Sequence, residues 1–213
     1  MIVAIDGPAA SGKGTIAKRV AAHYGLAYLD TGTLYRAIAR DTLARGGDPA
    51  DAGDALRSAK ALDPSTLDDP NLRNPGLGEA ASLVAKHPEV RKELLAYQRS
   101  FARAKSGAVL DGRDIGTVIC PYADVKLFVT ATPEERARRR YLELEQAGMA
   151  ISEAEVLRDI RRRDERDKHR AAAPLRKAPD AHLLDTTNLD IDAAFKAAIE
   201  LIDAALVRAG YAD

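Results

Sequence analysis

The chain has 213 residues, enough for one domain with a sizeable hydrophobic core. Its 32 basic and 32 acidic residues balance, which gives no electrostatic reason to expect binding to nucleic acid or to a membrane surface. The only cysteine, Cys120, excludes an internal disulfide, and no apolar run resembles a membrane span or a signal peptide. We therefore expect a cytoplasmic protein, and a monomer, since no heptad pattern marks an interface.

The N-terminal segment has the pattern of a phosphate-binding loop. An apolar run, Ile2 to Ile5, precedes a glycine-rich loop, and a helix is expected to begin at Lys13. Backbone N–H groups of such a loop and the positive end of the helix dipole point at bound polyphosphate. Lys13 is expected to reach the β and γ oxygens of ATP, and the Thr15 hydroxyl to bind Mg²⁺. The residues predicted to bind ATP are Gly7, Pro8, Ala9, Ala10, Ser11, Gly12, Lys13, Gly14 and Thr15.

This loop departs from the strict P-loop pattern at one position. Gly14 stands between Lys13 and Thr15, whereas the strict pattern has Ser or Thr directly after the lysine. The ending Gly-Lys-Gly-Thr resembles that of small-molecule kinases, above all those that act on nucleoside monophosphates.

Short apolar runs alternate with longer helical patterns along the rest of the chain. The runs are residues 2–5, 27–29, 108–110, 125–129 and 182–184. Such an alternation predicts an α/β fold in three layers, with a five-stranded parallel sheet flanked by helices on both faces. Four of the runs lead into Asp6, Asp30, Asp111 and Asp185. Because ligands of parallel sheets collect at the carboxyl ends of the strands, we expect these aspartates near the chemistry.

Capping residues mark the ends of several expected helices. Gly25 ends the first helix, Thr132 begins one that reaches about Gln146, and Ser152 opens another with a capping box. A last helix from about Asp190 is expected to turn its apolar residues toward the core, namely Ile191, Phe195, Ile199 and Ile202. Residues 46–79 are rich in Gly, Asp and Pro and predict loops around one short helix at 51–61.

Three further motifs follow the phosphate loop. They are Asp30-Thr-Gly-Thr-Leu-Tyr-Arg36, Asp111-Gly-Arg-Asp-Ile-Gly-Thr117 and Arg163-Asp-Glu-Arg-Asp-Lys-His-Arg170. Together with the loop they resemble the bacterial cytidylate kinases, in the right order and over essentially the whole chain. The resemblance implies the P-loop nucleoside monophosphate kinase fold as a single domain, residues 1–213. It further implies a core at about 1–30 and 101–213, an acceptor-binding segment at about 31–100 and a lid at about 148–170.

One segment departs from the family. Many members carry a longer, strand-rich insert in the substrate-binding portion, whereas residues 62–79 here are short and rich in Pro, Asn and Gly. We therefore expect no small second sheet in this chain.

The residue types suit phosphoryl transfer without a general base. A nucleoside monophosphate has a second pKa of about 6 and is mostly a dianion at neutral pH. The enzyme must therefore hold two polyanions in line and neutralise charge on the moving group, which calls for Lys, Arg and Mg²⁺. The predicted catalytic residues are Lys13, Arg113, Arg163 and Arg170. Arg163, Asp167 and Arg170 are spaced to share one face of a helix.

The resemblance also implies an acceptor site for CMP or dCMP. Arg163 and Asp167 would contact the ribose, Arg36, Arg113 and Arg170 the phosphate, Asp114 and Arg91 the base with help from Ser82, and Thr31 and Tyr35 would lie nearby. A carboxylate accepts from the N4 amino group of cytosine and an arginine donates to N3 or O2, whereas uracil would oppose O4 to the carboxylate. Asp111 is expected to orient Mg²⁺-bound water.

The predicted reaction is transfer of the ATP γ-phosphoryl group to CMP or dCMP, giving CDP or dCDP and ADP, with Mg²⁺. A kinase for UMP, AMP or a small metabolite is one alternative, and a P-loop regulatory ATPase is another. A GTPase would carry an Asn-Lys-x-Asp motif, but Asn71, Asn74 and Asn188 are not followed by lysine.

Overall fold

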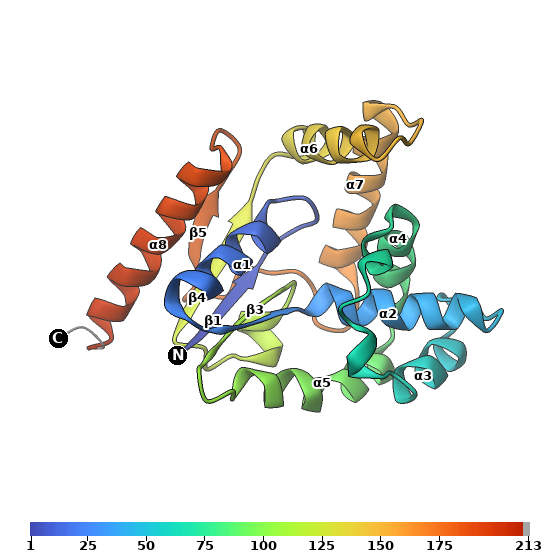
Figure 1. Ribbon diagram of the computed structural model, residues 1–213, viewed down its shortest axis with the longest axis horizontal. Helices are drawn as coiled ribbons and strands as arrows, with labels where there is room; N and C mark the ends of the chain where they lie inside the picture. Colours follow the sequence, from blue (N-terminus) through green and yellow to red (C-terminus); the bar gives the residue numbers. More distant parts are fainter. Residues whose placement is uncertain (211–213) are drawn as a thin grey trace.

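Five parallel strands form the centre of the structure, a computed structural model that describes residues 1–210 apart from the side chains of Arg73 and Pro75 (Figure 1). The strands are β1 (Ile2–Asp6), β2 (Ala27–Asp30), β3 (Ala108–Gly112), β4 (Val125–Thr130) and β5 (His182–Asp185). Their order in the sheet is β2-β3-β1-β4-β5, and every pairing is parallel. The predicted sheet is confirmed.

Eight α-helices and three short helical turns connect these strands within the described residues. The α-helices are α1 (Lys13–Tyr24), α2 (Thr31–Ala44), α3 (Ala52–Lys60), α4 (Pro75–Val84), α5 (Pro88–Ala102), α6 (Pro133–Gln146), α7 (Glu153–His169) and α8 (Ile191–Arg208). The turns are η1 (Pro64–Thr66), η2 (Pro70–Arg73) and the π-helical η3 (Ile115–Ile119).

The helix boundaries follow the capping residues. Gly25 ends α1 in the left-handed conformation, at φ 66°. The side chains of Thr132 and Asp190 each accept a hydrogen bond from the backbone N–H of the third residue of the helix that follows, α6 and α8 respectively. Ser152 and Glu155 form the predicted capping box of α7.

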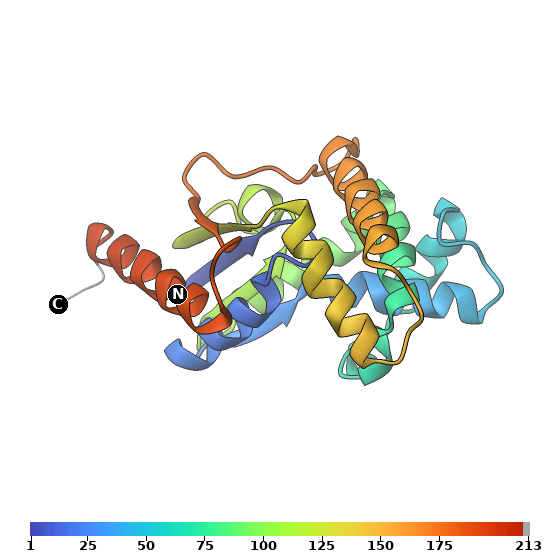
Figure 2. The ribbon, with the colours of Figure 1, turned by 90° about the horizontal axis from the view of Figure 1, so that it is seen from above.

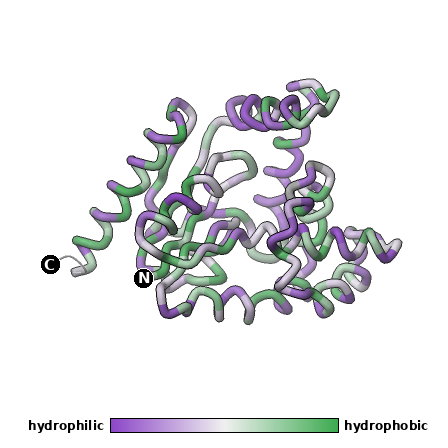
Figure 3. The backbone as a smooth tube through the Cα atoms, viewed as in Figure 1, coloured by the Kyte–Doolittle hydropathy of each residue, from purple (hydrophilic) through white to green (hydrophobic). Residues whose placement is uncertain are grey.

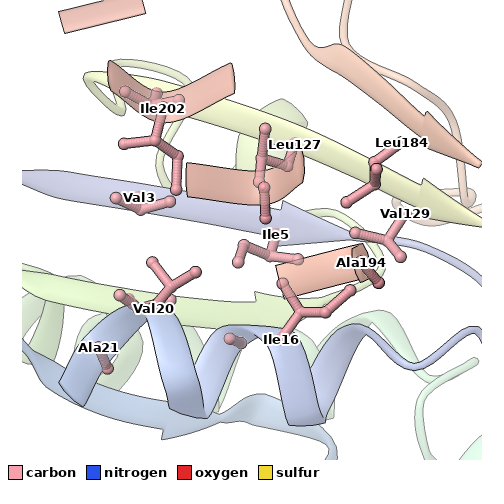
Figure 4. Packing of buried hydrophobic residues seen from close by; sticks show 14 residues of the cluster. Val3, Ile5, Ile16, Val20, Ala21, Leu127, Val129, Leu184, Ala194 and Ile202 are labelled. Carbon is pink, nitrogen blue, oxygen red and sulfur yellow. The ribbon is translucent and has the colours of Figure 1, made fainter. Parts of the chain in front are cut away.

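The helices α1 and α8 cover one face of the sheet. Val3 and Ile5 of β1 pack against Ile16 and Val20 of α1, and Ile202 of α8 belongs to the same buried cluster (Figure 4). The expected inward position of Ile191 is wrong, because this residue lies in the first turn of α8 and is 61 % exposed.

The opposite face is covered by α5 and η3. Leu95 and Phe101 of α5 pack against a cluster that contains Leu110 of β3 and Ile115 of η3. Cys120 is buried in this cluster as a small apolar residue. The sheet is therefore the middle of three layers, as its apolar strands require.

Further helices stand at one end of the sheet (Figure 1). Helices α2, α3, α4 and α5 share a third apolar cluster, and α6 packs on α7 through a small fourth one. Figure 3 shows that α6 and α7 are hydrophilic over most of their length. Figure 2 shows the chain from α7 returning across the molecule to β5.

The segment before α4 is short and has no strand of its own. Within the described residues, only helices and turns lie between β2 and β3, which confirms the absence of a small second sheet. The short helix expected at 51–61 is α3, but α4 begins inside the predicted loop because Pro75 occupies the first helical position, where its missing N–H costs nothing. No helix in residues 1–210 is long and apolar enough to cross a membrane.

Candidate active site

The loop between β1 and α1 depends on glycine at two positions, one because of a close contact and the other because of its backbone conformation. A Cβ atom on Gly7 would lie 2.0 Å from the carbonyl oxygen of Val129, so only glycine fits there. Gly12 has a φ of 81°, in the left-handed region, and α1 begins at the next residue. The first N–H groups of α1 therefore face the loop, as in a phosphate site.

Two adjoining pockets meet at Lys13. The inner pocket extends from Lys13 to Asp114 and Arg91, and the central pocket extends from Lys13 along α1 toward Lys18 and Arg140. Lys13, Arg36, Arg113 and Arg163 line both pockets. The junction is thus lined by cations that come from four separate segments of the chain.

Every residue predicted to contact CMP lines the inner pocket. The set is Thr31, Tyr35, Arg36, Ser82, Arg91, Arg113, Asp114, Arg163, Asp167 and Arg170. The predicted ATP-binding residues divide differently. Ala9, Ala10, Lys13, Gly14 and Thr15 line the central pocket, Ser11 and Gly12 line a third pocket beside the loop, and Gly7 and Pro8 line none of the three.

The far end of the inner pocket is a buried ionic cluster around Asp114. Arg91 forms an ion pair with Oδ2 of Asp114, and Nη2 of Arg170 lies 3.3 Å from Oδ1. The guanidinium of Arg91 also lies over the ring of Tyr35, 5.7 Å from its centroid. All four residues are buried, so a polar ligand here would exchange these bonds for its own.

Asp167 of α7 forms a second buried cluster. Its Oδ2 accepts from Nε of Arg113 at 2.9 Å, and its Oδ1 accepts from the Ser82 hydroxyl at 3.4 Å. Burial alone would raise the pKa of Asp167, but Arg113 and Arg170 lower it below its ordinary value. This carboxylate therefore stays ionised between α4, α7 and the turn after β3.

Arg170 is not on the predicted helix face. Helix α7 ends at His169, and Arg170 has an extended backbone with ψ 141°. Its Nε donates to the carbonyl oxygen of Ala173, 2.7 Å away, which turns the side chain back toward Asp114. Arg163 and Asp167 do share a face of α7, and all three residues line the inner pocket.

The strand order brings two of the four strand-end aspartates together. Asp30 and Asp111 are direct register partners on β2 and β3. Burial and the charge of Asp30 raise the pKa of Asp111 to about 7. Burial alone would also raise the pKa of Asp30, but Arg36, whose Nη2 lies 2.5 Å from Oδ2, and Lys13 lower it.

The expectation that Asp185 lies near the chemistry is wrong. Asp185 ends the outer strand β5, is exposed, and accepts from the N–H and hydroxyl of Thr187. Asp6 ends the middle strand and is buried; burial raises its pKa to about 7 although it accepts two backbone hydrogen bonds.

The cations at the junction are themselves crowded. Burial and the neighbouring Arg113 lower the pKa of Lys13 to about 8, and the same two causes lower the pKa of Arg163 to about 10. Nε of Arg163 is buried without a hydrogen-bond partner among the described residues. A bound polyanion would supply the missing negative charge.

An outer pocket lies on the opposite side of the loop and was not predicted. It is lined by Gly12 and Thr15, by Arg139 and Leu142 of α6, and by Ile191. Arg139 donates from Nη1 to the hydroxyl of Thr186 at 3.0 Å and from Nη2 to its carbonyl at 2.6 Å. In the sequence, Arg139 stands among many charged residues of one helix, and no local signal separates it from a surface ion pair.

Comparisons with known proteins identify the family. The family model for cytidylate kinase matches residues 3–204. A cytidylate kinase of Rhodopseudomonas palustris (strain ATCC BAA-98 / CGA009) is 59% identical over 210 residues, covering 99% of this chain and 98% of that protein. A cytidylate kinase of Nitrobacter winogradskyi (strain ATCC 25391 / DSM 10237 / CIP 104748 / NCIMB 11846 / Nb-255) is 57% identical over 212 residues, covering 100% of both.

A solved structure shares the fold. The crystal structure of an uncharacterized protein from Eubacterium ventriosum ATCC 27560 has a TM-score of 0.55 and 19% identity, covering 96% of this chain and 98% of that chain. At this identity the likeness concerns the fold alone. From the family match and its full-length relatives, the chain belongs to the cytidylate kinase family and is an ATP-dependent nucleoside monophosphate kinase.

Proposed function

We propose that this protein transfers the γ-phosphoryl group of ATP to CMP or dCMP, forming ADP and CDP or dCDP with Mg²⁺ as cofactor. One observation carries the proposal: the inner and central pockets meet at Lys13 and share Arg36, Arg113 and Arg163. Two anionic ligands entering from the two sides would place their phosphates end to end among these cations. That is the arrangement required for in-line transfer.

The phosphate loop and the outer pocket form the proposed donor site. Backbone N–H groups of the loop and of the first turn of α1 face the polyphosphate, and Lys13 reaches its reacting end. The outer pocket adjoins the loop at Gly12 and has the apolar side chains of Leu142 and Ile191 with the guanidinium of Arg139. A flat, electron-rich adenine ring suits that combination.

The acceptor phosphate is proposed to lie between Arg36, Arg113 and Arg170, and the ribose beside Arg163 and Asp167. Arg36 and Arg113 are anchored by carboxylates, through Asp30 and Asp167 respectively. Such second partners fix each guanidinium fork before the ligand binds, which lowers the cost of ordering it. Arg170 would leave Oδ1 of Asp114 to join them.

The cytosine base is proposed to lie between Asp114 and Arg91. The carboxylate would accept from the N4 amino group, while the guanidinium would donate to N3 or O2. Tyr35 and Thr31 line the same pocket. Uracil would place its O4, a hydrogen-bond acceptor, against the Asp114 carboxylate, which is also an acceptor. Such an unpaired buried polar contact costs about 1–3 kcal/mol of binding free energy.

The chain offers groups that fit Mg²⁺. Magnesium usually takes one or two protein ligands and completes its shell with phosphates and water, so no dedicated cluster is needed. The Thr15 hydroxyl lines the central pocket, and Oδ1 of Asp111 is buried with no hydrogen-bond partner in residues 1–210. We propose that Thr15 binds the ion and that Asp111 holds its water. The ion would neutralise phosphate charge when bound.

The protein's own part in the chemistry is positioning and charge neutralisation. The acceptor is already a dianion, so no side chain must remove a proton. Lys13, Arg113, Arg163 and Arg170 would balance the charge on the moving phosphoryl group. The acceptor-binding segment at about 31–100 and the lid at about 148–170 would close over the core and exclude water.

The remaining assignments are part of the same proposal. ATP as donor and a free, buried cysteine favour the cytoplasm, and the balance of 32 basic and 32 acidic residues favours nucleotides over nucleic acid as ligands. We propose that the protein acts there as a monomer.

A coupled ADP-release assay tests the function. The protein is given ATP and Mg²⁺ with CMP, dCMP, UMP or AMP in parallel. Fast turnover with CMP and dCMP and weak turnover with UMP and AMP is the expected result. Preference for UMP or AMP would overturn the roles of Asp114 and Arg91, and no turnover with any of the four would favour another acceptor or a regulatory ATPase.

A further inference from the structure

A buried carboxylate outside the pockets holds the turn that carries Asp114. Asp6 is 4% exposed and ends β1, directly before the phosphate loop. Its Oδ1 accepts from the backbone N–H of Ile115 at 2.7 Å, and its Oδ2 accepts from that of Gly116 at 2.8 Å. Both oxygens therefore bind one turn that is more than a hundred residues away in the chain.

These two N–H groups need an external partner. They are the first donors of η3, and the first N–H groups of a helical segment have no acceptor within it. The carbonyl oxygen of Asp114 accepts from Val118 and Ile119 at 2.9 and 3.1 Å, which makes the turn π-helical. The backbone of Asp114 is thus held by the hydrogen bonds that its own carbonyl oxygen accepts. The two residues that follow it are held by Asp6.

The close approach depends on Gly116. A Cβ atom there would lie 3.1 Å from Cδ of Lys126 and 3.4 Å from Oδ2 of Asp6. A larger residue would therefore push the turn away from the carboxylate. Short π-helical turns of this kind often occur where a functional side chain is aimed.

We propose that Asp6 is a positioning residue for base recognition: by holding Ile115 and Gly116, it places the Asp114 carboxylate against Arg91 and Arg170 at the end of the inner pocket. This inference rests on the proposed function, in which Asp114 reads the base. Asp6 itself touches none of the three pockets, so it acts only through the turn. Asp6 directly precedes Gly7, the first residue of the phosphate loop. Its hydrogen bonds therefore connect the turn that carries Asp114 to the start of that loop.

A carboxylate is specifically suited to this task. When ionised it has two acceptor oxygens and no donor, so it can bind two adjacent N–H groups at once. These two hydrogen bonds favour the ionised form against the burial that raises its pKa. An asparagine of the same size keeps one acceptor, but its NH₂ group would oppose the other N–H. The Asp6→Asn substitution therefore loosens the turn without changing the volume of the core.

The experiment is a double-mutant cycle on the ratio of kcat/KM for CMP to that for UMP. Wild type, Asp6→Asn, Asp114→Asn and the double variant are compared. We expect Asp6→Asn to lower the ratio about tenfold, through a higher KM for CMP, and to leave the KM for ATP within about twofold. If Asp6 acts through Asp114, the double variant has the same ratio as Asp114→Asn alone.

The outcomes separate this inference from the proposed function. If the wild type shows no preference for CMP, or if Asp114→Asn keeps it, base reading by Asp114 is wrong and both proposals fail. If Asp114→Asn loses the preference but Asp6→Asn keeps it, only the positioning role fails. If the fold losses in the CMP to UMP ratio of the two single variants multiply in the double variant, Asp6 and Asp114 act independently. That outcome also overturns the positioning role.

Asp124→Asn is the matched control. Oδ2 of Asp124 accepts from the N–H of Ile2 at 2.6 Å, at the other end of the same strand. This variant also removes a carboxylate from a backbone bond of β1, and it should keep the CMP to UMP ratio of the wild type. A lowered ratio in Asp124→Asn would mean that selectivity reports general loosening of β1, which contradicts the inference.

A measurement on the unmodified protein covers the case in which Asp6→Asn does not fold. Amide hydrogen exchange followed by NMR should find the N–H groups of Ile115 and Gly116 protected as strongly as those of β1 and β3. Rapid exchange of these two amides would show that Asp6 does not hold the turn, and it would overturn the inference without any variant.

Discussion

The Arg136 guanidinium on α6 binds the Asp164 carboxylate on α7 through two parallel bonds. Nη1 lies 3.0 Å from Oδ1, and Nη2 lies 2.5 Å from Oδ2. Nη1 also donates to the carbonyl oxygen of Ala9 in the phosphate loop at 3.1 Å. Both side chains are buried, and through Arg136 this ion pair connects α7, part of the proposed lid, to the loop that is proposed to hold ATP.

Asp164→Ala should destabilise the protein strongly. It leaves the Arg136 charge buried without its partner, and removing one member of a buried pair costs about 3–5 kcal/mol. Urea denaturation followed by circular dichroism measures the change. Glu165→Ala on the same helix removes an exposed carboxylate and should change the free energy of unfolding by about 0.5 kcal/mol at most. Equal losses in the two variants would show that the pair has no special role.

The low pKa of Lys13 predicts an alkaline limit to activity. Burial and the charge of Arg113 lower that pKa to about 8, and only the protonated amine attracts ATP phosphates. As pH rises through about 8, the free enzyme loses this charge, so kcat/KM for ATP should fall about tenfold per pH unit above it. Lys13→Arg keeps its charge at high pH and should lack this limb. If kcat/KM for ATP falls in the same way above about pH 8 in Lys13→Arg, the titrating group is not Lys13.

Glu79 of α4, in the proposed acceptor-binding segment, forms ion pairs with α7, which belongs to the proposed lid. Its Oε1 accepts from Nη2 of Arg166 on α7 at 2.5 Å and lies 3.6 Å from Nη2 of Arg162. Glu79→Gln weakens a partly exposed pair and should raise the KM for CMP about two- to fivefold, with kcat unchanged or higher. High salt should raise the KM for CMP more in the wild type than in the variant, because in the wild type it screens the Glu79 pair in addition to the contacts of the CMP phosphate. A change confined to the KM for ATP would contradict closure through this contact.

If adenine binds in the outer pocket, a substitution there should change the KM for ATP but not the KM for CMP. Arg139→Ala removes the cation and its bonds to Thr186, and it should raise the KM for ATP about tenfold while the KM for CMP stays within about twofold. Steady-state kinetics with each substrate varied in turn measures both constants. Arg138→Ala removes the exposed arginine next to it and serves as the control. Equal effects on both KM values would place adenine elsewhere.

Local features of this protein were predictable because their causes are local. The phosphate loop is recognisable from a glycine-rich run between an apolar strand and a helix start. The caps at Thr132 and Ser152 act on N–H groups three residues away, so the sequence contains both partners. Apolar runs of three to five residues marked all five strands, since the strands of a parallel sheet covered by helices on both faces are mainly apolar.

Predicting the inner pocket from sequence depended on motifs rather than on contacts. The resemblance to the cytidylate kinases named the residues that line the pocket, but not how they pair. Arg91 with Asp114, and Arg113 with Asp167, are partners only after α5, α7 and the turn beyond β3 have packed together.

The class of the fold, the phosphate loop and the residues available for the acceptor were all recognisable in the amino-acid sequence. Which of these residues act together depends on how the strands and helices pack. The strand order places Asp30 beside Asp111 and leaves Asp185 on the far edge, and it brings Asp6 under the turn at Ile115 and Gly116. The physical reason is that a hydrogen bond or ion pair forms between groups close in space, and spacing along the chain does not encode distances between packed elements.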